Sequence, residues 1–79
     1  MSFVFSIAGR DSGRLFLVTE VAGDYALIAD GKLRRLEKPK RKKIRHLRVS
    51  QFESYRGEMT NRAISSRIKA LVAESVIVD

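Results

Sequence analysis

The most distinctive chemistry in this chain lies between Lys32 and Arg48, where ten lysines and arginines accompany a single acidic residue, Glu37. The segment therefore carries a formal charge of +9 (ten minus one), whereas the whole chain carries only +7. A concentrated charge attracts a polyanion, whereas the same charge scattered over a surface mainly keeps a protein soluble. The chemistry that this segment offers is binding of nucleic-acid phosphates.

Apolar residues such as Leu36 and Ile44 interrupt the basic segment, which indicates a folded basic surface rather than a tail. Charge runs are usually solvated faces, but Lys40–Lys43 within a folded domain favours a polyanion that offsets the self-repulsion. An anionic membrane surface would need a basic amphipathic helix, and Pro39 argues against one. We therefore expect no membrane partner, and we predict nucleic-acid contacts for Lys32, Arg34, Arg35, Lys38, Lys40, Arg41, Lys42, Lys43, Arg45, His46 and Arg48.

A second candidate is the loop Gly9-Arg10-Asp11-Ser12-Gly13-Arg14, which lies between two apolar segments. Its two glycines allow a sharp turn and a close approach to a phosphate, and its arginines offer planar forks for phosphate oxygens. Asp11 would repel a phosphate, so we expect it to pair with Arg10 or to cap the turn. The alternative is a plain hairpin loop with solvated arginines, but the basic segment in the same small chain favours RNA contact.

Catalytic and metal chemistry find little support in the sequence. His46 is the only histidine and the chain has no cysteine, so His46 is better interpreted as a packing or phosphate-contact residue than as a metal ligand. Ser65 and Ser66 have no histidine near them in sequence, and no paired carboxylates stand out. We therefore predict no enzyme activity, no cofactor and no metal. Tyr25 and Tyr55 are kept as candidates for stacking on bases.

Short β-prone segments fill the first half of the chain and must position these residues. Apolar patterns and turn residues predict strands over 3–8, 14–22, 25–29 and 32–38. Leu15 to Val18 are apolar in succession, which predicts a strand buried on both faces. Asp30-Gly31 predicts a two-residue hairpin turn, and Pro39 should end the strand that follows it. Short strands at this spacing indicate a small barrel or sandwich.

The pattern changes after Arg48. Residues 51–55 are compatible with a short helical turn ended by Gly57, and Thr60 is a suitable N-cap. Apolar residues then recur at helical spacing, which predicts a helix over about 60–74. The sequence leaves open whether 76–78 frays, extends a strand or packs on the barrel.

The loop from Ala8 to Arg14 resembles the KOW family, and most closely its large-subunit ribosomal branch, in which an A-G-R-x-x-G-R/K loop precedes a buried strand. The resemblance continues through Ala29-Asp30-Gly31-Lys32, Lys38-Pro39-Lys40 and His46-Leu47, and covers about Val4 to Arg48. Ser12 departs from the family's commoner lysine. The resemblance implies an SH3-like barrel and RNA binding by Gly9, Arg10, Ser12, Gly13 and Arg14. A small group of stand-alone bacterial KOW proteins likewise ends in a short helix.

Together these observations predict a mainly β fold with a C-terminal helix: an SH3-like KOW barrel of about five strands over 1–49, and a helical extension over 50–79 that packs on it in a single domain. The predicted function is a non-catalytic, ribosome-associated module that binds structured ribosomal RNA. The alternative is a protein-interaction module of the translation or transcription machinery that uses the barrel or the helix face. The lack of cysteine and of an apolar run near ~18 residues leads us to expect a cytoplasmic protein. We also expect a monomer, with ribosomal proteins as further partners.

Overall fold

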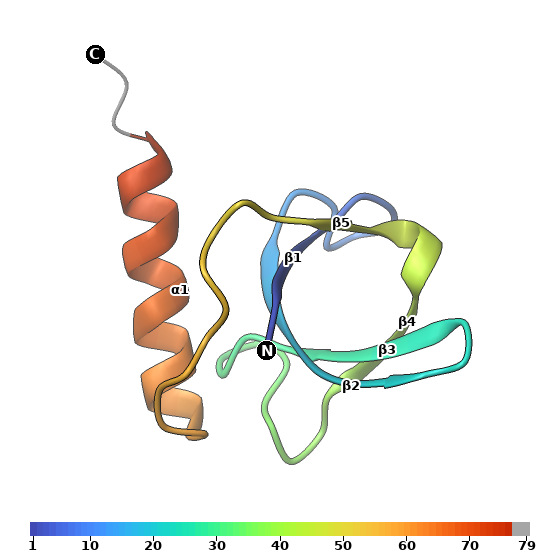
Figure 1. The fold of residues 1–79 in the computed structure, drawn as a ribbon, viewed down its shortest axis with the longest axis horizontal. Helices are drawn as coiled ribbons and strands as arrows, with labels where there is room; N and C mark the ends of the chain where they lie inside the picture. The colour runs from blue at the N-terminus through green and yellow to red at the C-terminus, as the bar shows by residue number, and fades with distance from the viewer. Residues whose placement is uncertain (77–79) are drawn as a thin grey trace.

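Five strands form one antiparallel sheet in the computed structural model, which describes residues 1–76 (Figure 1). The sheet order is β4-β3-β2-β1-β5, and a single long helix follows the strands. The prediction of a mainly β fold with a C-terminal helix is confirmed. The elements are β1 (Phe3–Ser6), β2 (Leu15–Ala22), β3 (Tyr25–Ala29), β4 (Lys40–Lys43), the 3-10 helix η1 (Ile44–His46), β5 (Leu47–Val49) and α1 (Asn61–Val76).

The sheet curls strongly, and η1 joins its two edge strands β4 and β5 (Figure 1). Strand β2 is the longest and pairs with both neighbours, with β1 over Leu15–Leu17 and with β3 over Leu17–Ala22. A register shift between Val18 and Glu20 interrupts the β2–β3 ladder, and such irregularities bend a strand and increase its twist. Over residues 1–76, β4 and β5 do not pair with each other, so the hydrogen-bonded sheet remains open.

Two apolar clusters lie on opposite faces of β2. One contains Phe16 with residues of β1 and β3, and it fills the inside of the curled sheet. The other contains Leu15, Leu17 and the buried Ile64 of α1, and it lies between the sheet and the helix. The successive apolar residues of β2 are therefore buried on both faces, as predicted.

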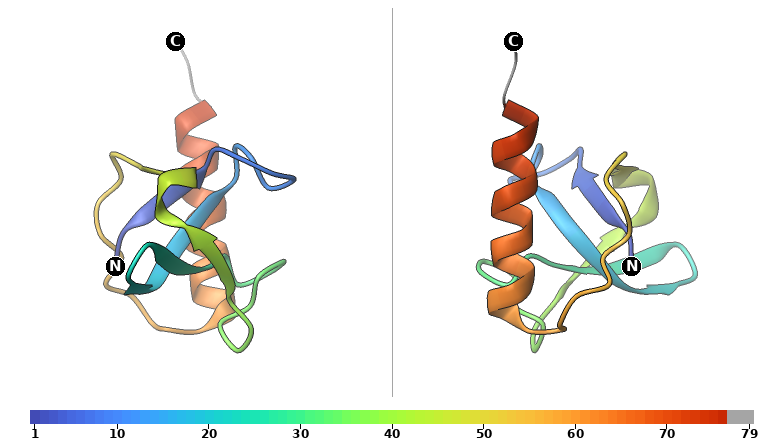
Figure 2. Two further views of the ribbon diagram at one scale, coloured as in Figure 1. Left: turned by 90° about the vertical axis from the view of Figure 1, so that its right-hand side faces the viewer. Right: turned by 60° about the vertical axis from the view of Figure 1, so that its left-hand side comes forward.

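The helix begins as the sequence predicts and packs by the predicted face. Thr60 caps it, because the Thr60 Oγ1 accepts a hydrogen bond from the Ala63 N–H at 3.1 Å. Ile64 is fully buried, and Ile68 and Leu71 are partly buried against the same cluster. Figure 2 shows the helix running alongside the curled sheet. Of the segment 76–78, residues 77 and 78 lie outside the described part of the chain.

The strand predicted over 32–38 is wrong. The chain forms bends and turns there, and the strand lies at Lys40–Lys43, after Pro39 instead of before it. The reason is local: the Asp30 carboxylate accepts hydrogen bonds from the backbone N–H groups of Lys32 and Arg34 at 3.0 and 2.8 Å. Backbone groups satisfied in this way do not need a ladder partner. The connection after β3 is therefore a ten-residue loop over 30–39 rather than a two-residue hairpin.

Two smaller predictions are also corrected. Residues 51–55 contain no helical turn, and the short turn of helix lies instead at η1. The first strand ends at Ser6 rather than at Ala8. The Ile7 N–H donates to the His46 carbonyl at 2.9 Å, so the chain leaves β1 toward η1 before it turns.

Candidate nucleic-acid interface

The loop between β1 and β2 is held in a defined turn by its own backbone. The Ser12 N–H donates to the Gly9 carbonyl at 3.2 Å, and the Gly13 N–H donates to the Ser6 carbonyl at 2.7 Å. Gly13 has φ 88°, a left-handed conformation that a residue with a Cβ rarely adopts. All five residues that the resemblance assigned to this loop are exposed: Gly9, Arg10, Ser12, Gly13 and Arg14.

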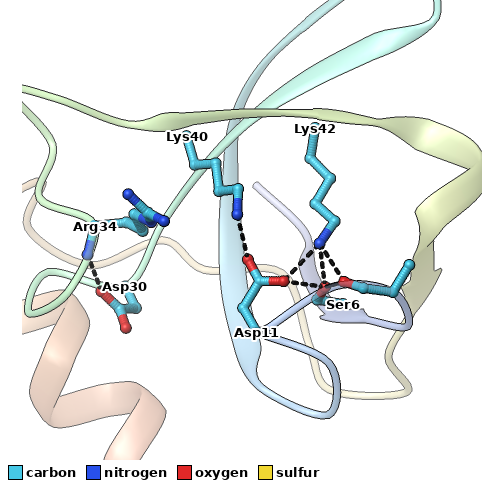
Figure 3. A network of polar contacts seen from close by, with 7 residues as sticks. Ser6, Asp11, Asp30, Arg34, Lys40 and Lys42 are labelled. Atoms are coloured by element: carbon cyan, nitrogen blue, oxygen red, sulfur yellow. Dashed lines mark hydrogen bonds and ion pairs between the residues drawn. The ribbon is translucent and has the colours of Figure 1, made fainter.

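Asp11 is the exception, because its carboxylate points inward and binds two lysines of β4 (Figure 3). The Lys42 Nζ lies 2.5 Å from Asp11 Oδ1, and the Lys40 Nζ lies 3.1 Å from Asp11 Oδ2. The Ser6 hydroxyl also donates to Asp11 Oδ1, at 2.9 Å. Asp11 was expected to pair with Arg10 or to cap the turn. It pairs with β4 instead.

Burial alone would raise the pKa of Asp11, because it penalises the charged form. Hydrogen bonds from Lys42, Ser6 and Lys40 outweigh that effect and hold the pKa of Asp11 well below its ordinary value. The carboxylate is therefore ionised at neutral pH. The ammonium groups of Lys40 and Lys42 offset its negative charge.

Lys42 is fully engaged in this cluster. Its ammonium donates to Ser6 Oγ at 2.7 Å and to the Ala8 carbonyl at 2.6 Å, in addition to Asp11. An ammonium has three N–H donors, and Lys42 is only 8 % exposed. The prediction that Lys42 contacts RNA is therefore withdrawn: its ammonium fastens the loop to β4. We call Ser6, Asp11, Lys40 and Lys42 the loop clasp.

The alternation of side chains along β4 explains this split. Successive residues of a strand point to opposite faces, so Lys40 and Lys42 reach the loop while Arg41 and Lys43 face away from it. Arg41 and Lys43 are exposed. Lys42 therefore serves the fold, whereas Arg41 and Lys43 face outward. Lys40 pairs with Asp11 and remains partly exposed.

Beside the clasp, the β1–β2 loop and the 30–39 loop meet at a small pocket of about 340 Å³. Arg10 and Arg14 line it from the first loop, and Arg34 and Lys40 line it from the chain around β4. The Arg34 backbone is fixed by its hydrogen bond to Asp30 (Figure 3). Four cationic side chains, three from the two loops and one from the start of β4, surround one pocket and provide a site for an anion with several oxygens.

The 30–39 loop is fastened to the start of α1. The Asn61 side chain accepts a hydrogen bond from the Leu36 N–H at 2.7 Å and donates one to the Glu37 carboxylate. Gly31 lies so close to the Asn61 backbone that a Cβ would collide with it. Bonds from Asn61, from the Glu37 backbone N–H and from Arg35 lower the pKa of Glu37 to about 2.

Sequence reasoning missed Asn61 as a contributor to the interface. Asn61 lies 25 positions from Leu36 and 24 from Glu37, and no local sequence motif predicts contacts over such a separation. Helix periodicity assigns only a helical position to Asn61. The pairing with the loop depends on how α1 packs on the sheet.

The remaining predicted residues spread from the 30–39 loop across η1 to β5. Lys32 and Lys38 are exposed, and Arg35 is exposed but paired with Glu37 at 3.1 Å. His46 is half-buried. Lys43 at the end of β4, Arg45 in η1 and Arg48 in β5 are exposed.

No protein-family model matches the chain, and a search of curated proteins finds no significant match. Among the residues that the structure describes, no helix combines the length and the apolar character that crossing a membrane requires.

Proposed function

We propose that this chain is a non-catalytic RNA-binding module of the KOW type that binds structured ribosomal RNA in the cytoplasm. The observation that carries the proposal is the convergence of Arg10, Arg14, Arg34 and Lys40 around one pocket. The loop that supplies the first two is held in place by a buried clasp rather than left free. Preorganised cations lose less entropy on binding a phosphate than flexible ones do.

The fold supports an SH3-like barrel. Its five strands follow one another around a curled sheet, and the edge strands β4 and β5 are joined by the single turn η1 (Figure 1). An SH3-like barrel has this kind of small, strongly bent, antiparallel sheet. The loop between β1 and β2 and the loop before β4 lie together at one side of the curled sheet, where the pocket is found.

RNA is favoured over a protein partner because Glu37 is the only acidic residue among the ten lysines and arginines between Lys32 and Arg48. Phosphate contacts provide most of the affinity in such an interface, and the shape of the RNA provides the selectivity. A protein-interaction module is the alternative, with ribosomal proteins as partners. Pull-down of the tagged chain with and without ribonuclease separates the two, since protein partners that survive the nuclease would support the alternative.

A matched pair of double variants tests the proposed site. Arg10→Ala with Arg14→Ala removes two charges at the pocket, and Arg62→Ala with Lys69→Ala removes two exposed charges from α1. By filter binding, the pocket variant should lose about tenfold in affinity or more for a structured RNA, since hydrogen bonds to charged groups contribute about 1.5–3 kcal/mol each. The helix variant should lose much less, because neither Arg62 nor Lys69 lines the pocket. Equal losses would refute the assigned site.

A further inference from the structure

A second pocket, of about 480 Å³, lies at the C-terminal end of β4 and is lined by Lys43, which faces away from the loop clasp. It is formed where the turn between β2 and β3 meets the start of η1, and the Ile44 N–H joins the two sides by donating to the Asp24 carbonyl at 2.8 Å. Its walls combine one aromatic ring, one aliphatic side chain, one carboxylate and two cations. They are Tyr25, Ile44, Asp24, Lys43 and Arg45.

Tyr25 is held on the outer surface of the sheet rather than in its core. It lies opposite Lys43 in the β3–β4 ladder, and it belongs to neither apolar cluster of the described residues. The Arg41 guanidinium lies 4.0 Å from the ring centroid. Arg41 thus covers one face of the ring, and Tyr25 lines the pocket whereas Arg41 does not. A half-buried aromatic ring fixed by an arginine is a suitable surface for stacking a base.

Asp24 has no role in the charge balance of the fold. It is exposed and, within residues 1–76, forms no ion pair, although Lys43 and Arg45 line the same pocket. A carboxylate at this place opposes a phosphate. It is suited instead to accept hydrogen bonds from the N–H groups of a base.

We propose that this pocket binds an unpaired guanine of the RNA, a specificity that rests on the function proposed above. The base stacks on Tyr25 and contacts Ile44, while the guanine N1–H and amino group donate side by side to the two Asp24 oxygens. Uracil and adenine cannot offer two adjacent donors in this way. Lys43 and Arg45 neutralise the flanking phosphates.

The spacing along β4 allows one RNA to occupy both sites. Lys40 lines the pocket beside the clasp and Lys43 lines the Tyr25 pocket. Their positions on the strand are about 10 Å apart. The two side chains point to opposite faces of β4, so one RNA reaches both pockets by passing along this edge strand of the sheet. The first site then holds backbone phosphates and the second reads a nearby unpaired base, in accordance with the usual division between positioning and specifying contacts.

The test compares a fully paired RNA hairpin with the same hairpin carrying a single bulged guanosine, adenosine or uridine. The wild-type chain should bind the bulged guanosine tightest. Tyr25→Leu should reduce that preference by about 5- to 150-fold, which is the range for stacking one base on an aromatic side chain. Its affinity for the paired hairpin should not change. Tyr25→Phe should keep the preference, which controls for damage to the fold. Asp24→Asn should reduce discrimination between guanosine and uridine without weakening the paired hairpin.

Two outcomes would overturn the base pocket while leaving the proposed function intact. One is a wild-type chain that binds all four hairpins equally while Arg10→Ala weakens all of them. The other is a set of Tyr25 and Asp24 variants that weaken paired and bulged RNA alike. A wild-type chain that binds none of the four RNAs would overturn both the base pocket and the RNA-binding function.

Discussion

Lys42 and Lys43 are neighbours of the same type, yet the structure predicts opposite consequences for replacing them. Lys42→Met removes the ammonium that binds Asp11, Ser6 Oγ and the Ala8 carbonyl. Lys43→Met removes an exposed ammonium one position along β4. The first change should destabilise the fold, and the second should weaken RNA binding without affecting the fold.

The size of the first effect follows from burial. Removing one partner of a buried ion pair costs about 3–5 kcal/mol because the other charge is left uncompensated. Lys40 and Ser6 remain as partners of Asp11, so we take the lower value, about 3 kcal/mol. For a domain of this size 1 kcal/mol shifts Tm by about 4–8 °C, so Tm should fall by about 12–24 °C.

The assay is thermal unfolding at pH 7, followed by circular dichroism. Lys43→Met is the matched control and should cost no more than about 0.5 kcal/mol, as is usual for surface substitutions. Adding Asp11→Asn to Lys42→Met should recover part of the loss, because no unpaired charge then remains. Equal Tm values for the two single variants would refute the assignment of Lys42 to the loop clasp.

Three further effects follow from the same contacts. The folded-state pKa of Asp11 is lowered, so the ionised carboxylate stabilises the fold above its unfolded pKa of about 3.9, and this contribution is lost as the pH falls toward the folded pKa. At pH values below about 4, Tm should therefore decrease. Asp11→Asn should flatten that part of a Tm–pH titration. Asn61→Ala removes no charge but removes the hydrogen bonds that hold the 30–39 loop. It should weaken RNA binding severalfold and speed amide hydrogen exchange at Leu36. An unchanged exchange rate would show that Asn61 does not hold the loop. Gly31→Ala should unfold at clearly lower denaturant concentration than Gly13→Ala, since both glycines have positive φ but only Gly31 faces the Asn61 backbone; equal midpoints would contradict that close approach.

Local patterns predicted the elements whose formation depends on local chemistry. The apolar run that begins at Leu15 indicated a strand buried on both faces, and Thr60 with the apolar spacing after it indicated the helix. The strand predicted over 32–38 failed because the Asp30 side chain satisfies the following backbone groups and holds a loop open. Composition does not distinguish that loop from a strand.

The loop clasp could not be predicted from the sequence, because it depends on which residues of β4 point toward the loop and which point outward. Charge counting treats Lys40 to Lys43 as equivalent, whereas the strand places Lys42 inside and Lys43 outside. The partner of Lys42 lies 31 residues away at Asp11, and no local spacing rule connects them. The loop residues, in contrast, are neighbours in the sequence, so their types, their order and the resemblance that they carry were enough to make them candidates.

The salt dependence of RNA binding tests the central claim most directly. If about five to seven of the exposed cations contact phosphates, a plot of log K against log salt concentration should have a slope of about −4 to −6. Neutralising Arg10 and Arg14 together should reduce the magnitude of the slope by up to about 2, whereas neutralising Arg62 and Lys69 should leave it unchanged. A slope near zero for the wild-type chain would contradict electrostatic binding of RNA by this surface.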